Sequence, residues 1–166
     1  VSKIYADNHM IDVTGAGYEG KGDFLINNRK INLEKDEVLD RLVKGSVICN
    51  DARIERTGED NIYSIRGTPT EASLLIMAAK AGIHIEDLEF KRVEEMPFDS
   101  KRKMMSVLCK MEKENYVFSK GAPEVILNKS SKIYKNGLMV SLRDKDREKI
   151  LNMNEKFANQ ALMVLA

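Results

Sequence analysis

The sequence has few cysteines, no long apolar run and no excess of one charge. Its two cysteines, Cys49 and Cys109, lie far apart without a pairing pattern, which favours packed thiols in a reducing compartment over a disulfide. The longest apolar run, residues 72–79, is far shorter than the roughly 20 residues that cross a bilayer, and no charged-then-apolar leader precedes it. The 27 basic residues balance 26 acidic ones, whereas nucleic-acid-binding domains are usually more basic. We therefore expect a soluble piece that binds neither nucleic acid nor membrane.

Metal ligands at a recognisable spacing are also lacking. His9 and His84 have no second ligand nearby in the sequence, so neither is expected to hold a metal. The length of 166 residues suits a single domain with its own core, and we expect one domain over residues 1–166. Because the chain begins with Val1, we expect it to be a fragment excised from a larger protein.

The periodicity of apolar residues predicts an α+β fold, an antiparallel sheet flanked by helices, because the strands come as hairpins instead of alternating βαβ units. An Asn-Gly pair at positions 136 and 137 gives the clearest hairpin signal. The predicted strands are residues 3–7, 10–14, 61–65, 92–96, 104–110, 116–119 and a closing strand at 162–166. The predicted helices are residues 33–50, 68–82, a short piece at 85–90, a brief one from Pro123, and 144–160, whereas residues 51–60 are predicted to form a loop.

A glycine-rich stretch follows the opening hairpin, with Gly15, Gly17 and Gly20 in the spacing of a dinucleotide-binding fingerprint. That fingerprint needs a helix to begin at its third glycine. Here polar residues follow, and no helical periodicity appears before Leu33. We therefore interpret the stretch as a surface loop.

The second long helix carries a capping box, in which Thr68 caps, Pro69 takes the first helical position and Glu71 reaches back to the cap amide. A carboxylate at this position is equally able to accept a hydrogen bond from the exocyclic amine of adenine. From these residues alone capping is the better explanation, because it accounts for Glu71 without a ligand.

Two further stretches have the chemistry of a nucleotide pocket. Phe98 follows Pro97 and precedes a basic run that ends at Lys103, and an aromatic face beside ammonium groups suits a base joined to phosphates. Lys120 is followed by Gly121, whose missing Cβ would let a ligand approach the backbone. Each feature also has a simpler explanation, a core aromatic or solvated surface lysines.

Three motifs in this order carry a resemblance: GTPTEASLL at 67–75, PFDSKRKMMSV at 97–107 and SKGAPEVIL at 119–127. Together they resemble the nucleotide-binding domain of P-type cation-transporting ATPases, with the calcium-pump-like branch as the best fit. The resemblance extends over most of the chain, from the opening residues through CNDA at 49–52 to the closing ALMVLA.

The resemblance implies a role for each candidate residue. Glu71 would recognise adenine, Phe98 would stack on it, Lys103 and Lys120 would bind the phosphates of ATP, and Gly121 would lie beside them. It also implies a cytoplasmic-facing domain of an integral membrane pump, which delivers the γ-phosphate to an aspartate of a neighbouring domain. Its partners would be the phosphorylation and actuator domains of the same polypeptide, and Mg²⁺ would be held by ligands outside this fragment.

The sequence also departs from the family pattern. Met163 stands where the family usually has an arginine that assists phosphate binding, so weak nucleotide affinity is expected. The DKTGT segment with the phosphorylated aspartate and a GDGxND-like magnesium segment are both missing, so the fragment is expected to bind ATP without completing hydrolysis. The alternative is a regulatory or protein-interaction domain that has lost the nucleotide site.

Overall fold

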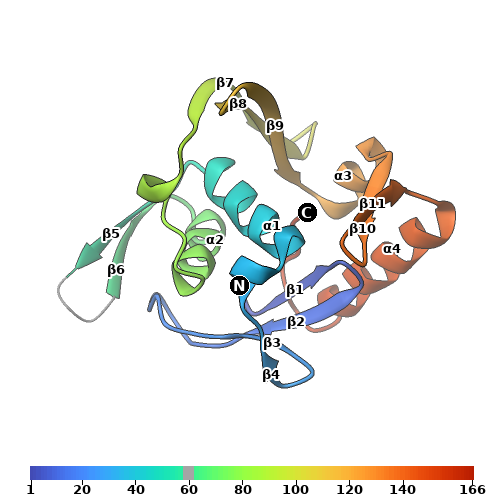
Figure 1. Cartoon of the computed structure of the whole chain (residues 1–166), viewed down its shortest axis with the longest axis horizontal. Helices are drawn as coiled ribbons and strands as arrows, with labels where there is room; N and C mark the ends of the chain where they lie inside the picture. Colours follow the sequence, from blue (N-terminus) through green and yellow to red (C-terminus); the bar gives the residue numbers. More distant parts are fainter. Residues whose placement is uncertain (58–61) are drawn as a thin grey trace. The chain divides into compact units, whose positions relative to one another are not determined.

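The computed structural model describes residues 1–57 and 62–166 (Figure 1). The chain divides into two compact units, Val1–Glu89 and Phe90–Ala166, and each is described by itself. Every strand pair in the described residues is antiparallel, and helices occur in both units. The predicted α+β class is confirmed, although the strands form several small sheets instead of one. The expectation of a single domain stays a prediction.

The first unit opens with a four-stranded sheet in the order β1-β2-β3-β4. Its strands are β1 Lys3–Ala6, β2 His9–Val13, β3 Phe24–Ile26 and β4 Arg29–Lys30. The predicted opening hairpin is confirmed, and its turn residues Asp7 and Asn8 both have positive φ, as a two-residue hairpin turn of this hand requires. Asn27 and Asn28 make the same kind of turn between β3 and β4. We did not predict this second hairpin, because its strands are only three and two residues long.

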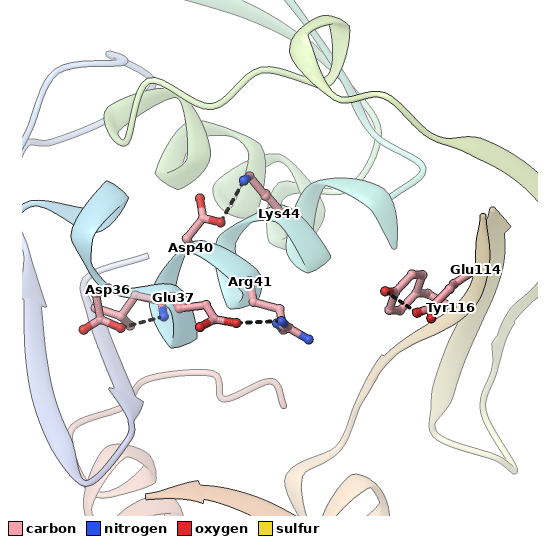
Figure 2. Close-up of polar contacts among 8 residues, drawn as sticks. Asp36, Glu37, Asp40, Arg41, Lys44, Glu114 and Tyr116 are labelled. Atoms are coloured by element: carbon pink, nitrogen blue, oxygen red, sulfur yellow. Dashed lines mark hydrogen bonds and ion pairs between the residues drawn. The ribbon is translucent and has the colours of Figure 1, made fainter. Parts of the chain in front are cut away.

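The helix predicted from residue 33 begins with a 3-10 turn, η1 Leu33–Lys35, and continues as α1 Glu37–Ile48 after the cap residue Asp36. The Asp36 carboxylate accepts a hydrogen bond from the backbone N–H of Leu39 at 3.1 Å. Figure 2 shows this cap and the ion pairs Glu37–Arg41 and Asp40–Lys44, each one turn apart on the helix. These local interactions explain why a helix forms here.

A stripe of buried side chains on α1 faces the core of the first unit. Leu39, Val43 and Val47 repeat every four residues and are almost fully buried. Leu42 also lies on α1, but it is exposed because it is one residue off this spacing. The core joins α1 to the sheet and to α2 through Ile4, Ile11, Val13, Phe24, Leu33, Leu39, Val43, Val47, Ala52, Leu75, Met77 and Ala78.

The predicted second helix is confirmed as α2 Pro69–Lys80, capped by the Thr68 hydroxyl, which accepts from the Glu71 N–H. The helix ends at Lys80 with Ala81 as its C-cap, and Gly82, predicted to stop it, follows with φ +73°. The N–H of Gly82 donates to the Ala79 carbonyl and that of Ile83 to the Ala78 carbonyl, which is the Schellman pattern. A short 3-10 turn follows as η2 Ile85–Asp87, within the predicted helical piece.

Between the two helices, β5 Arg53–Thr57 pairs with β6 Ile62–Arg66. The prediction of a loop over 51–60 is therefore wrong for β5. The last part of the predicted loop, residues 58–60, falls outside the described residues. Charged residues in RIERT suggested a loop, but backbone pairing with β6 makes the segment a strand. The strand predicted at residues 61–65 corresponds to β6.

The second unit contains a three-stranded sheet in the order β7-β8-β9. Its strands are β7 Lys91–Asp99, β8 Met104–Met111 and β9 Glu114–Gly121, each longer than predicted. Met105, Val107 and Cys109 of β8 are at most 1% exposed. The three residues therefore mark the buried face of the sheet.

The rest of the second unit comprises α3 Pro123–Lys129, β10 Lys132–Lys135, β11 Leu138–Ser141 and α4 Asp144–Ala158. The Asn136-Gly137 hairpin is confirmed, with positive φ at both residues. Arg147 of α4 donates to the carbonyls of Leu127 and Ser130, which ties α4 to the end of α3. No described helix is long and apolar enough to span a bilayer.

The closing strand predicted at 162–166 is not formed as a strand in the structure. Only Ala166 pairs with the sheet: its N–H donates to the Gly121 carbonyl at 3.0 Å, and the Gly121 N–H donates back at 2.8 Å. One reciprocal pair is too short a ladder to count as a strand.

Candidate nucleotide-binding site

The five predicted site residues are divided between the two units. Phe98, Lys103, Lys120 and Gly121 belong to the second unit, at one end of the β7-β8-β9 sheet. Glu71 belongs to the first unit, in the first turn of α2. The two groups are therefore described separately.

A β-bulge brings Phe98 into line with Lys120. In the pairing of β7 with β8, Met96 lies opposite Ser106 and Asp99 opposite Met104, so two residues of β7, Pro97 and Phe98, face the single residue Met105. Met105 in turn pairs with Lys120 on β9. With strands about 4.8 Å apart, the Phe98 and Lys120 backbones flank Met105 at a separation of about 10 Å.

Phe98 is 64% exposed, so it is not a core aromatic. Bulges commonly occur next to binding sites, where they redirect a side chain. An exposed aromatic on a bulged strand is suitable for stacking on a flat ligand, which stays a prediction. Met105, nearly fully buried between the two positions, was not among our candidate residues.

Lys103 lies at the last position of the turn between β7 and β8, with φ +55°. This left-handed conformation is uncommon for a residue with a side chain. The turn is closed by Asp99, whose carbonyl accepts from the Lys103 N–H at 2.7 Å and whose carboxylate accepts from the N–H groups of Lys101 and Arg102. The Lys103 carbonyl accepts from the Ala122 N–H at 2.9 Å, so the turn is also fixed to the segment after β9.

Gly121 is small for a structural reason that we did not predict. A Cβ added there would lie 2.4 Å from the Lys103 carbonyl oxygen and 2.6 Å from the Met104 Cβ. The protein's own backbone therefore fills the space in which we expected a ligand to approach. A direct role for Gly121 in nucleotide binding stays a prediction.

An acidic side chain lies near the cationic end of this group. The Lys103 Nζ lies 3.8 Å from Glu124 Oε1, and the two side chains are 60% and 50% exposed. Exposed pairs of this kind contribute at most about 1 kcal/mol. Glu124 lies in the first turn of α3, and no pattern in the sequence indicated its contact with Lys103.

Glu71 is half-buried and holds the start of α2 through its own side chain. Its Oε2 accepts from the Thr68 hydroxyl at 3.1 Å, whereas we had expected the backbone amide of Thr68 as its partner. Its Oε1 accepts from the Asp51 N–H at 3.3 Å, a contact with the segment after α1 that the sequence did not reveal. The cap by Thr68 is confirmed and Glu71 contacts it through the Thr68 hydroxyl, whereas adenine recognition stays a prediction.

Met163 is 79% exposed, and it stands where an arginine was expected from the resemblance. Within the described ranges no group of three His, Cys, Asp or Glu side chains is placed to hold a metal ion. Burial raises the pKa of the Cys109 thiol. None of these features adds a fixed positive charge or a nucleophile beside Lys103 and Lys120.

Comparisons with known proteins place the chain in a family. A family model described as "P-type ATPase, cytoplasmic domain N" matches residues 38–166. A calcium-transporting ATPase of Bacillus subtilis is 34% identical over 169 residues, covering 100% of this chain and 19% of that protein. Calcium-transporting ATPase 1 of Lactococcus lactis is 35% identical over 127 residues, covering 75% of this chain and 14% of its own length.

A more distant relative agrees with these two. The human calcium-transporting ATPase type 2C member 1 is 26% identical over 165 residues, covering 97% of this chain and 17% of that protein. The chain thus spans less than a fifth of the length of these relatives. Because the family model matches most of its residues, the chain belongs to the family of P-type ATPase cytoplasmic N domains.

Proposed function

We propose that this domain binds ATP, with the adenine base stacked on Phe98. The alignment of Phe98, Met105 and Lys120 across the sheet is the observation that carries the proposal. It sets the backbone of an exposed aromatic about 10 Å from the backbone of a lysine, with a buried methionine between them. That separation suits a nucleotide whose base lies at one end and whose phosphates lie at the other.

Lys103 and Lys120 bind the phosphates in this proposal. Lys103 projects from a turn fixed by Asp99 and Ala122, so the backbone that carries its ammonium group is ordered before the ligand arrives. Preorganisation of this kind lowers the entropic cost of binding. Gly121 allows the two lysine-bearing segments to lie against each other.

Glu71 supplies base selectivity. A carboxylate oxygen has two lone pairs and can accept from the adenine amine while it also accepts from the protein. Guanine presents a carbonyl oxygen at the same position, which the carboxylate would repel.

In the complete protein, the bound ATP would be positioned for transfer of its γ-phosphate to an aspartate of a neighbouring phosphorylation domain, with the actuator domain as a further partner. Calcium is the transported ion that the names of the relatives suggest. The domain would face the cytoplasm, Mg²⁺ would be bound by ligands outside this chain, and membrane attachment would come from the transmembrane part. The chain alone binds ATP without completing hydrolysis.

Titration of the ¹⁵N-labelled chain with ATP, followed by amide NMR, tests the proposal. We expect chemical-shift changes centred on Phe98, Lys103, Lys120 and Glu71, and smaller changes with adenosine at the two lysines. Tripolyphosphate alone is the matching control for the phosphate half, and should shift only the lysine region. The absence of any shift at millimolar ATP would contradict the proposal and favour a regulatory or protein-interaction domain.

A further inference from the structure

Asn50 is a buried polar residue just after α1, with only 5% of its surface exposed. Its side-chain amide makes hydrogen bonds to three backbone groups. Nδ2 donates to the Ser46 carbonyl at 3.2 Å and to the Glu71 carbonyl at 3.0 Å, and Oδ1 accepts from the Ala52 N–H at 2.9 Å. One side chain therefore connects the end of α1, the first turn of α2 and the start of β5.

Asp51, the residue after Asn50, contacts the side-chain carboxylate of Glu71. The Asp51 N–H donates to Glu71 Oε1 at 3.3 Å, and the Thr68 hydroxyl donates to Oε2 at 3.1 Å. Both carboxylate oxygens and the backbone carbonyl of Glu71 are thus bonded to surrounding groups. A glutamate side chain otherwise has considerable rotamer freedom, and these contacts restrict it.

Ala52 completes the contact between the two segments. A Cβ added at Gly67, which has φ +128°, would lie 2.7 Å from the Ala52 Cβ and 2.8 Å from its Cα. The residue before the Thr68 cap is therefore packed directly on the residue that Asn50 orients. Three consecutive residues, 50–52, fix the start of α2.

We propose that Asn50 is a positioning residue for base recognition, because it fixes the backbone of Glu71 and directs the Asp51 N–H to the Glu71 carboxylate. This inference rests on the proposed base-binding role of Glu71. Losing the Asn50 donor leaves the Glu71 carbonyl without this partner and lets the first turn of α2 shift. The carboxylate then discriminates less well between an amine and a carbonyl oxygen on the base.

The decisive variant is Asn50→Asp in the full 166-residue chain. It keeps the shape and the acceptor for Ala52, and it replaces the donor to Ser46 and Glu71 with an oxygen. The measurement is the ratio of the Kd for GTP to the Kd for ATP, obtained by calorimetry. We expect this ratio to fall by about 3- to 10-fold, as loss of the hydrogen bond to the Glu71 carbonyl would produce.

Val47→Ala is the matched control for stability. Val47 is 1% exposed on the same helix and has no part in the Asn50 network, so the variant destabilises the unit through a cavity. We expect its GTP-to-ATP Kd ratio to equal that of the wild type. A purely structural role for Asn50 would make the two variants behave alike, which would overturn the inference.

A second route avoids the buried site, in case Asn50→Asp does not fold. Thr68 is exposed, and Thr68→Val removes at constant shape both the donor to Glu71 Oε2 and the cap acceptor for the Glu71 N–H, whereas Thr68→Ser restores a hydroxyl for both. We expect the ratio to fall in Thr68→Val and to recover in Thr68→Ser.

The outcomes separate this inference from the function on which it rests. An unchanged ratio in Asn50→Asp, or in Thr68→Val where the first variant is unfolded, overturns the positioning role alone, provided that Glu71→Gln lowers the ratio. An unchanged ratio in Glu71→Gln overturns the base role of Glu71 and the positioning role with it.

Discussion

At the scale of single residues, Phe98 gives the most direct test of the base-binding half. Replacement by alanine should weaken ATP binding by about 1–3 kcal/mol, the usual range for stacking of a base on an aromatic ring. Because Phe98 is 64% exposed, stability in urea should change little. Tyr18→Ala, at another exposed aromatic, serves as the control and should leave the ATP Kd unchanged. A loss of stability with an unchanged Kd per folded molecule would contradict stacking.

Lys120 tests the phosphate half by its dependence on charge. Lys120→Ala should weaken ATP more than adenosine, and the Kd for ATP should then vary less with salt, because the lost interaction is a screened one. Titrations at low and high ionic strength measure both effects. Lys110→Ala, an exposed lysine on the adjacent strand, is the control. Equal weakening of adenosine and ATP at every salt concentration would show that Lys120 lies on the base side.

Replacement of Glu124, unlike that of Phe98 or Lys120, should strengthen ATP binding. Its carboxylate lies 3.8 Å from Lys103 Nζ and partly neutralises the charge that the phosphates would meet. Glu124→Gln should therefore tighten ATP binding at low salt, by at most about 1 kcal/mol because the pair is exposed. The gain should shrink as salt is added. An unchanged or weaker affinity at low salt would mean that Lys103 does not meet the phosphates.

At the scale of elements, the β10-β11 hairpin is joined to α4 through a buried carboxylate. Asp146 Oδ1 accepts from Lys135 Nζ at 2.6 Å, and Oδ2 accepts from the Arg143 N–H at 3.2 Å. The hydrogen bond from Lys135, supported by the one from Arg143, lowers the pKa of Asp146. The stabilisation should therefore be complete above the ordinary aspartate pKa of about 4 and should be lost as pH falls through the lower folded-state pKa.

Urea unfolding followed by circular dichroism at a series of pH values tests this. Asp146→Asn should be less stable than the wild type at neutral pH, and the difference should narrow as the pH drops below about 4. Asp144→Asn, in the same helical turn but exposed, is the control and should lower neutral-pH stability less. A difference that is constant from neutral to acid pH would contradict this role of the Asp146 charge.

The elements themselves differ in how well the sequence predicts them. Thr68, Gly82 and the Asn136-Gly137 turn are local signals, since each acts on its own neighbours in the chain, and the structure has all three where expected. The Asn27-Asn28 hairpin was not predicted because β3 and β4 are only three and two residues long, and β5 was not predicted because its charged residues do not mark a strand without its partner β6. In both cases the pairing with a neighbouring strand determines that the segment is a strand.

The same distinction applies to the candidate site. The residues Phe98, Lys103 and Lys120 were identifiable by type and by resemblance, whereas the bulge that sets Phe98 opposite Met105 is a property of strand register. The contact of the Asp51 N–H with Glu71 joins residues 20 positions apart, and no local pattern predicts it. Sequence reasoning could therefore name candidate groups, and only the fold could show which of them are neighbours within a unit.

For the molecule as a whole, we predict binding without turnover. The chain has no DKTGT or GDGxND-like segment, so it lacks the family's phosphate acceptor and magnesium-binding residues. Incubation with Mg²⁺ and ATP should release no phosphate above the rate in buffer, whereas the NMR titration should show saturable binding of ATP. Phosphate release that persists in Lys120→Ala would indicate a contaminating ATPase, and release abolished by that variant would contradict the prediction.

Both cysteines are buried, Cys49 at 1% and Cys109 at 0% exposure, and the pKa of Cys109 is raised. Thiol reagents attack accessible thiolates, so the native chain should resist modification. A single cysteine introduced at exposed Val93 on β7 would then take up a maleimide fluorophore selectively, without prior removal of the natural thiols. Because these two side chains are buried, the domain can be labelled at one chosen site with a fluorophore that reports nucleotide binding.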